Sequence, residues 1–150
     1  MKREISNKEY DAMVKTASPN SQLFKDMVCA FFVGGIICVI GQLINNGFSA
    51  LKFNKEDAAA LTSASLIFIG AFLTGISVYD DIANVGKAGT LVPITGFANS
   101  IVSPAIEYKT EGYVLGVGAK MFTIAGPVLA YGISASVIYG IIYKLTSGGL

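Results

Sequence analysis

Charged residues divide the chain into long apolar blocks separated by short polar segments. No Asp, Glu, Lys or Arg occurs in four stretches, at residues 27–51, 58–79, 88–106 and 121–143. A helix that crosses a bilayer needs about 20 largely apolar residues, and the first, second and fourth stretches are long enough. The pattern therefore predicts an all-α membrane protein with three to four transmembrane helices. Residues 27–150 form the predicted membrane domain, and residues 1–26 form a polar N-terminal segment in the cytoplasm or at the membrane interface.

The third uncharged stretch has a different pattern, because Gly89, Pro93, Gly96 and Pro104 interrupt it. Proline suits the first turn of a helix, and helices commonly end just before a proline. A helix over residues 93–103 would be about 16 Å long, which is half of a bilayer. Irregular backbone at membrane depth is tolerated only where protein or a water-filled cavity surrounds it. We therefore predict a re-entrant half-helix in addition to the full spans.

Small residues recur on the predicted spans at spacings that let two helices approach closely. We expect helix packing at Gly34, Cys38, Gly41, Gly75 and Gly126. The first span is predicted to cover residues 27–44, because the Asn-Asn-Gly run that follows is typical of a helix end. The second span is predicted to cover residues 58–79. The last span has small residues on two faces, which indicates a helix wedged between neighbours and predicts an oligomer.

A glycine-rich run at residues 86–100 carries the strongest signal for a binding site. Glycine-rich backbone that opens a short helix at membrane depth presents free N–H groups and the positive end of the helix dipole to an anion. Broken helices do this at transporter substrate sites. The candidate ligand or pore residues in this run are Lys87, Thr90, Thr95, Asn99 and Ser100. The alternative is a surface loop followed by an ordinary interface helix.

Three charged residues after the half-helix are further candidates for a pore or ligand site. Glu107 and Glu111 are one helical turn apart, so both carboxylates share a face if this segment is helical. They would then hold Ca²⁺ loosely or ring a pore mouth, whereas a solvated loop is the more common use of such residues. Lys120 borders the last span, and it either reaches the interface or faces a permeating anion.

Composition excludes several other classes of protein. Charged residues make up 14% of the chain and mean hydropathy is +0.60, whereas soluble domains carry about 25% charged residues. A net charge of +1 without a basic run gives no footprint for nucleic acid. The chain has no His, which excludes His-based catalysis and His-ligated metal sites. Two cysteines alone do not build a zinc site. From these absences taken together, we expect no metal site, no cofactor and no enzyme activity.

Several runs of the sequence are specific enough to suggest a family. They include AFFVGGIIC at residues 30–38, VPITGFANS at 92–100, EYKTEG at 107–112 and GVGAKMFTIAGP at 116–127. These runs resemble the SpoVAC/SpoVAE family of sporulation membrane proteins, and the polar N-terminal segment is similar to that of its AC-type members. The family reads Ala-Gly-Ala-Gly where this chain has Gly86-Lys87-Ala88-Gly89. Lys87 therefore adds a positive charge at the start of the half-helix.

This resemblance implies a role in spores. Members of this family resemble the membrane subunits of a complex that moves dipicolinic acid, as its calcium chelate, across the inner spore membrane. Uptake occurs during sporulation and release during germination, and the AC-type members are associated with mechanosensitive channel behaviour. The implied partners are an AD-type soluble subunit, an AE-type membrane subunit and the lipid membrane, with dipicolinate and Ca²⁺ as the transported species. The implied location is the cell membrane, as a multi-pass protein of the inner spore membrane.

Two functions remain open at this point. Dipicolinate is a flat dianion, and the N-terminus of the half-helix together with Thr95, Asn99 and Ser100 would suit its carboxylates. The first function is therefore a channel subunit whose re-entrant segment lines the pore. The alternative is a structural membrane scaffold that positions a different pore-forming subunit.

Overall fold

The computed structural model describes residues 6–17 and 22–147 of the chain. These residues form helices joined by short connections, and they include no strand. The elements are α1 (Asn7–Ala17), α2 (Leu23–Ala50), α3 (Lys55–Gly75), α4 (Tyr79–Gly86), α5 (Ala88–Leu91), α6 (Ile94–Glu107), the 3₁₀-helix η1 (Tyr108–Glu111), the π-helix η2 (Tyr113–Gly118) and α7 (Ala119–Thr146).

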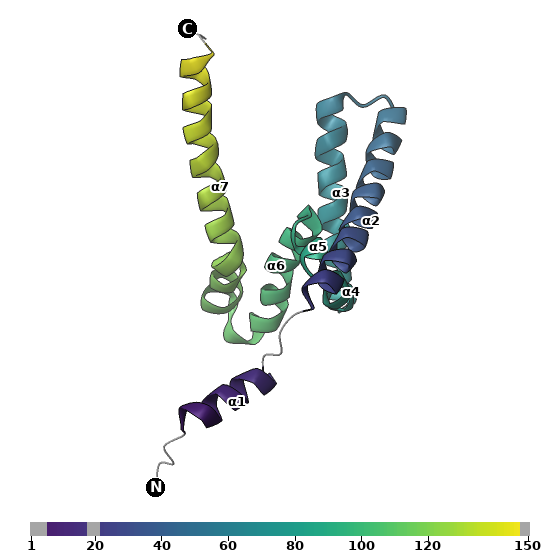
Figure 1. The fold of residues 1–150 in the computed structure, drawn as a ribbon. Helices are drawn as coiled ribbons and strands as arrows, with labels where there is room; N and C mark the ends of the chain where they lie inside the picture. The colour runs from purple at the N-terminus through teal and green to yellow at the C-terminus, as the bar shows by residue number, and fades with distance from the viewer. Residues whose placement is uncertain (1–5, 18–21, 148–150) are drawn as a thin grey trace.

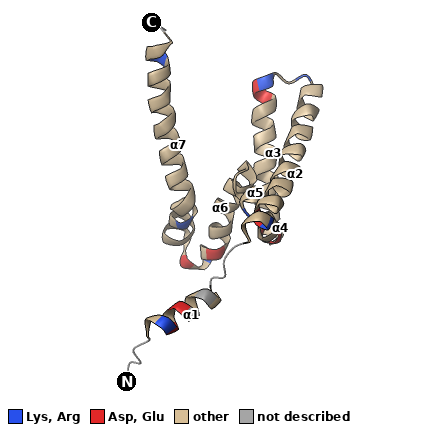
Figure 2. Ribbon diagram, viewed as in Figure 1, with Lys and Arg blue, Asp and Glu red and all other residues tan. Residues whose placement is uncertain are grey.

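Three helices in the described part of the chain are long and apolar enough to cross a membrane. They are α2, α3 and the continuous helix formed by η2 and α7. This result confirms the predicted all-α membrane protein. In Figure 1, α2 and α3 lie side by side as a hairpin, whereas α7 stands apart from them. In the three long helices, Figure 2 shows the charged residues gathered near the ends, with uncharged helix between them, which is the distribution that a bilayer favours.

The first span is longer than the sequence predicts. Residues 45–47 lie inside α2, which continues to Ala50, so the predicted end at residue 44 is wrong. The amide of Asn45 does not turn the chain, because its Nδ2 donates to Oγ1 of Thr62 on α3 at 3.1 Å. A polar side chain that bonds across to a neighbouring helix no longer competes with its own helix backbone.

The second span begins at a side-chain cap and ends earlier than predicted. Oδ1 of Asn54 accepts a hydrogen bond from the backbone N–H of Asp57 at 2.7 Å, which satisfies one of the free donors of the first turn. The helix ends at Gly75 instead of Tyr79. Ser77 has a φ of 60°, a left-handed conformation through which an α-helix does not continue. Tyr79 consequently begins α4.

Elements α4, α5 and α6 follow a re-entrant path. In Figure 1, α4 lies at the end of the hairpin where α3 finishes, α5 lies further along the hairpin, and α6 returns toward the starting end. The half-helix α6 continues through Pro104 to Glu107, so the predicted end at residue 103 is wrong. Pro104 falls near the last turn of α6, where the loss of one backbone bond and the fixed φ of proline are least disruptive.

The interior of the protein lies mainly where α2 to α6 meet, and we call these five helices the packed unit. The buried apolar side chains of the described residues are Ala58, Tyr79, Ala98 and Ala125, of which α7 supplies the last. The contacts of α7 with the rest of the chain are concentrated on α6 and η2. Most other α7 side chains are exposed, for example Tyr131 at 78%.

Candidate functional site

Glycines bring the backbones of α5 and α6 into direct contact with their neighbours. A Cβ atom on Gly89 of α5 would lie 2.8 Å from the Cα of Ala30 on α2. A Cβ atom on Gly96 of α6 would lie 2.8 Å from a carbonyl oxygen of α5, and one on Gly70 of α3 would lie 3.1 Å from the Cα of Thr95. Only glycine permits such approaches without displacement. The break between α5 and α6 is therefore held against both helices of the hairpin.

The side chain of Tyr79 links the two sides of this break. It is 3% exposed, and its hydroxyl oxygen lies 2.9 Å from the carbonyl oxygen of Thr90 in α5 and 3.0 Å from Oγ1 of Thr95 in α6. The phenol has one hydrogen, and a carbonyl oxygen can only accept. Tyr79 therefore donates to Thr90, and the hydroxyl of Thr95 donates to the Tyr79 oxygen.

A second buried polar contact joins α3 to α6. Thr74 is 6% exposed, and its Oγ1 lies 2.7 Å from the carbonyl oxygen of Gly70 and 2.9 Å from Oδ1 of Asn99. Its single hydrogen is shared between these two acceptors. Every buried side-chain nitrogen or oxygen among the described residues has a hydrogen-bond partner. The network is therefore closed, as burial in a low-dielectric interior requires.

Three of the five candidates in the glycine-rich run take part in these two sets of contacts. We define the polar junction as Thr74, Tyr79, Thr90, Thr95 and Asn99. Thr90 is fully buried, with its Oγ1 donating to the carbonyl oxygen of Lys87 at 2.9 Å. The other two candidates lie outside it. Ser100 donates to the carbonyl oxygen of Phe97 within α6 at 2.8 Å, and the Lys87 side chain is exposed.

The backbone of Lys87 is strained at the connection between α4 and α5. Its φ is 48° and its ψ is −127°, a region that glycine adopts readily and other residues avoid. Its charged side chain is exposed outside the polar junction. In this conformation Lys87 therefore forms a strained connection between two helices, and its charge is exposed to the surroundings.

The first turn of α6 is covered by protein. Thr95 is 5% exposed, Gly96 is buried against α5, and the N–H of Gly96 donates to the carbonyl oxygen of Pro93 at 2.9 Å. An anion would reach Thr95 or Gly96 only if α5 and Tyr79 moved away from them. The conformation described here therefore holds the predicted anion-binding turn closed.

The two glutamates lie in helices of different type. Glu107 ends α6, whereas Glu111 ends the 3₁₀-helix η1, and both are exposed. A 3₁₀-helix has 3.0 residues per turn, so residues four apart are rotated away from each other. The condition for a shared carboxylate face, a regular α-helix, is not met. Within residues 6–17 and 22–147, no group of three or more acidic or Cys residues is arranged to hold a metal ion.

Lys120 is partly buried beside an aromatic ring. Its Nζ lies 4.4 Å from the centroid of the Tyr108 ring, which is within the range of a cation–π interaction. Tyr108 belongs to η1 and Lys120 to the first turn of α7, so this contact spans the bend between α6 and α7.

Two of the predicted packing positions lie against another helix. A Cβ atom on Gly34 of α2 would lie 3.2 Å from the carbonyl oxygen of Gly89 on α5. One on Gly41 would lie 3.3 Å from Cδ1 of Leu66 on α3. Both contacts are tight enough that an added methyl group would push the neighbour.

The other three predicted packing positions do not bring two helices of this chain together. Cys38 is exposed, and Gly75 has no atom within 4 Å of an added Cβ. The nearest atom to a Cβ on Gly126 is Cβ of Phe122 in the same helix, at 3.7 Å. Among the described residues of one chain, these positions have no packing role between helices.

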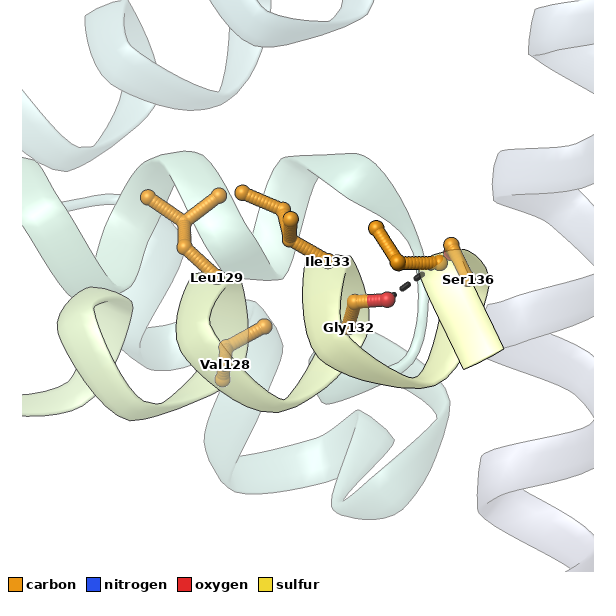
Figure 3. A pocket seen from close by; sticks show the side chains of 6 residues that line it. Val128, Leu129, Gly132, Ile133 and Ser136 are labelled. Atoms are coloured by element: carbon orange, nitrogen blue, oxygen red, sulfur yellow. Dashed lines mark hydrogen bonds between the residues drawn. The ribbon is translucent and has the colours of Figure 1, made fainter. Parts of the chain in front are cut away.

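A groove of about 420 Å³ runs along the exposed part of α7. It is lined by Val128, Leu129, Gly132, Ile133, Ser136 and Val137. Figure 3 shows Ser136 turned back onto its own helix, where its Oγ donates to the carbonyl oxygen of Gly132 at 2.8 Å. The hydroxyl is thereby satisfied, and the groove presents a mainly apolar surface.

Thr74 and Tyr79 are the two residues of the polar junction that the sequence analysis does not single out, and only Tyr79 has a local signal that could have found it. At the end of an uncharged stretch, a tyrosine resembles an ordinary interfacial anchor. A usable signal follows it, because Asp80 and Asp81 suit the first turn of a new helix. That signal places Tyr79 at the start of α4 instead of at the end of a span.

The three candidate spans define a multi-pass membrane protein. Between the second and third spans, the chain follows a re-entrant path in which the helix is broken between α5 and α6, and the side chains at this break are polar and buried. Residues 26–142 match the SpoVAC/SpoVAEB sporulation membrane protein family, and the chain belongs to that family. It is 47% identical over 134 residues to stage V sporulation protein AC of Bacillus subtilis strain 168, an alignment that covers 89% of each chain. No solved structure matches the chain.

Proposed function

We propose that this sporulation membrane protein is a subunit of the complex that moves dipicolinic acid, as its calcium chelate, across the inner spore membrane. It would act in uptake during sporulation and in release during germination. The observation that carries the proposal is the polar junction. Thr90, at 0% exposure, and Thr95, at 5% exposure, lie on either side of the break between α5 and α6.

The chemistry of the junction suits an anion with carboxylates. Hydroxyl and amide groups, together with the first-turn N–H groups of α6, donate hydrogen bonds without bringing a fixed countercharge. Such a site binds a dianion weakly enough to release it, as conduction requires. Because α5 and Tyr79 cover the first turn of α6, the conformation described here corresponds to the closed state of such a pathway.

The proposed complex contains copies of this chain together with other subunits. We propose an AD-type soluble subunit and an AE-type membrane subunit as partners, and an oligomeric assembly in the membrane. The exposed apolar length of α7 supports this, because three spans with one standing apart do not enclose a pore by themselves.

Reconstitution of the purified chain tests the proposal. Vesicles loaded with calcium dipicolinate are compared with and without the protein, at rest and under osmotic or suction-induced tension. Dipicolinate release is measured by terbium luminescence outside the vesicles. We expect tension-dependent release only with the protein, and glutamate loaded at the same concentration controls for a nonselective leak. No release above protein-free vesicles, with the protein shown to be folded and inserted, would contradict the channel function.

The alternative function is a membrane scaffold that positions a different pore-forming subunit. One observation favours it: every buried polar side chain in the described residues is satisfied within the chain, as in a static core. Under this alternative, the chain alone releases no dipicolinate, whereas co-reconstitution with the membrane and soluble partners does. Thr95→Asp and Thr95→Val separate the two functions in that mixture. A pathway at this turn loses flux far more with the aspartate, because its charge repels the dianion, whereas a scaffold at equal protein levels loses it equally with both.

A further inference from the structure

We propose that Tyr79 is a positioning residue that latches α5 to α6, and that release of this latch uncovers the buried face of α6. The transport consequence rests on the proposed function, whereas the latch itself does not. The contact is direct, since one hydroxyl oxygen lies 2.9 Å from the Thr90 carbonyl oxygen and 3.0 Å from Thr95 Oγ1.

The backbone beside the break does not supply the same link. The N–H of Val92 donates back to Ala88 at 3.3 Å, and the N–H of Gly96 donates back to Pro93 at 2.9 Å. Each bond stays on its own side of the break. The tyrosine hydroxyl therefore bridges two segments that are otherwise held together by packing.

The position of Tyr79 is set by α4, whose two ends differ in environment. Tyr79 begins the helix at 3% exposure, and the exposed Asp80 and Asp81 follow it directly. At the other end, Gly86 is buried so tightly that an added Cβ would lie 2.7 Å from Cγ1 of Val33 on α2. If the exposed acidic turn moves while Gly86 stays fixed, α4 pivots about its Gly86 end and the Tyr79 hydroxyl is withdrawn from the break.

A cysteine on the buried face of α6 reports the latch without any transport assay. Ala98 is 4% exposed and lies one turn after Thr95, so Ala98→Cys is shielded while the latch is closed. Cys29 and Cys38 are replaced by Ser, and the full chain is reconstituted in vesicles. The measured quantity is the rate at which a small, membrane-permeant methanethiosulfonate modifies the introduced cysteine.

We expect Tyr79→Phe and Thr95→Val each to raise the modification rate at least fivefold. The double variant should be no faster than either single variant, because both remove the same contact. Thr95→Ser keeps the hydroxyl and should leave the rate unchanged. Tyr131→Phe makes the same chemical change on an α7 side chain that is 78% exposed, and it should also leave the rate unchanged.

Two results would overturn the latch: an unchanged rate in Tyr79→Phe, or an equal rise in Tyr131→Phe. If Tyr79→Phe lowers the helicity measured by circular dichroism, the Thr95→Val and Thr95→Ser variants test the latch in its place. Equal modification rates in these two variants would overturn the latch. Dipicolinate release from the same vesicles separates the two proposals. Faster modification without release contradicts the transport function alone, whereas tension-dependent release with unchanged modification contradicts the latch alone.

Discussion

The packed unit and α7 use glycine for different purposes. In the packed unit, several glycines mark places where one backbone lies on another, as at Gly89 of α5 against α2 and at Gly70 of α3 against α6. On α7, Gly132 and Gly140 have no atom within 4 Å of an added Cβ. The same residue type thus fixes structure in one region and leaves an open surface in the other.

This difference shows what small residues predict in a membrane protein. Lipid tails are as apolar as leucine, so helices associate where small residues allow backbones to approach. A small-residue stripe that no helix of the same chain covers is available to lipid or to another chain. Substitutions at the glycines in close contact should therefore affect the fold of the packed unit, whereas those on the exposed face of α7 should leave the fold unchanged.

The largest expected effect is that of Gly89→Ala. The added methyl group would overlap the backbone of Ala30, and overpacking of this kind costs about 3 kcal/mol of unfolding free energy. The matched control is Gly132→Ala on α7, where the higher helix propensity of alanine should raise the unfolding free energy by about 0.5–1 kcal/mol. Unfolding followed by circular dichroism in mixed micelles, as the mole fraction of dodecyl sulfate rises, measures both. Equal losses in the two variants would contradict the division into two regions.

Gly34→Leu and Gly35→Leu sharpen the comparison within a single helix. A Cβ on Gly34 already lies 3.2 Å from the carbonyl oxygen of Gly89, whereas Gly35 has open space. We expect Gly34→Leu to lose about 2 kcal/mol of unfolding free energy and Gly35→Leu to change it by less than about 0.5 kcal/mol. The same micelle titration measures both, and a larger loss in Gly35→Leu would show that α2 faces its partners differently.

Thr74→Val and Ser136→Ala compare one hydroxyl from each region. Loss of the buried Thr74 hydroxyl leaves Oδ1 of Asn99 without its donor, which should cost about 1–2 kcal/mol. Ser136 bonds only to its own exposed helix, so its replacement should stay within about 0.5 kcal/mol. Thermal unfolding in detergent measures both changes, and a Ser136→Ala loss as large as that of Thr74→Val would argue for a structural contact on α7.

The smallest expected effect is a gain from Lys87→Gly. The lysine has a φ of 48°, and relief of this strain should raise the unfolding free energy by about 1 kcal/mol. Lys87→Ala removes the charge but keeps a Cβ in the same conformation, so it should not stabilise. If both variants stabilise equally in thermal unfolding, the charge and not the backbone is the cause.

Much of the fold follows from where charged residues are missing, and the errors share a physical cause. The uncharged stretches located three spans and the short re-entrant helix, because burial in lipid acts on the composition of long segments. The uncharged stretches did not locate the ends of the helices correctly, because a helix end depends on a few individual contacts. Asn45 bonds to Thr62 instead of capping α2, and the left-handed Ser77 ends α3 ahead of Tyr79.

The candidate site was predictable only in part. Thr90, Thr95 and Asn99 stand out as polar residues in an uncharged run, and the structure places them together. Their partners Thr74 and Tyr79 come from α3 and α4, and no local pattern connects residues so far apart in the sequence. The roles of all these residues in transport stay predictions.

The order of the elements along the chain has a consequence for synthesis. The packed unit is complete in sequence by Glu107, before any residue of α7. Because a chain emerges from its N-terminus onward and domains generally fold as units, the hairpin, the latch and the backbone contacts can form while α7 is still inside the ribosome. In that order of events, the last span joins a structure that is already formed, and its exposed face is the last part of the chain to reach the membrane.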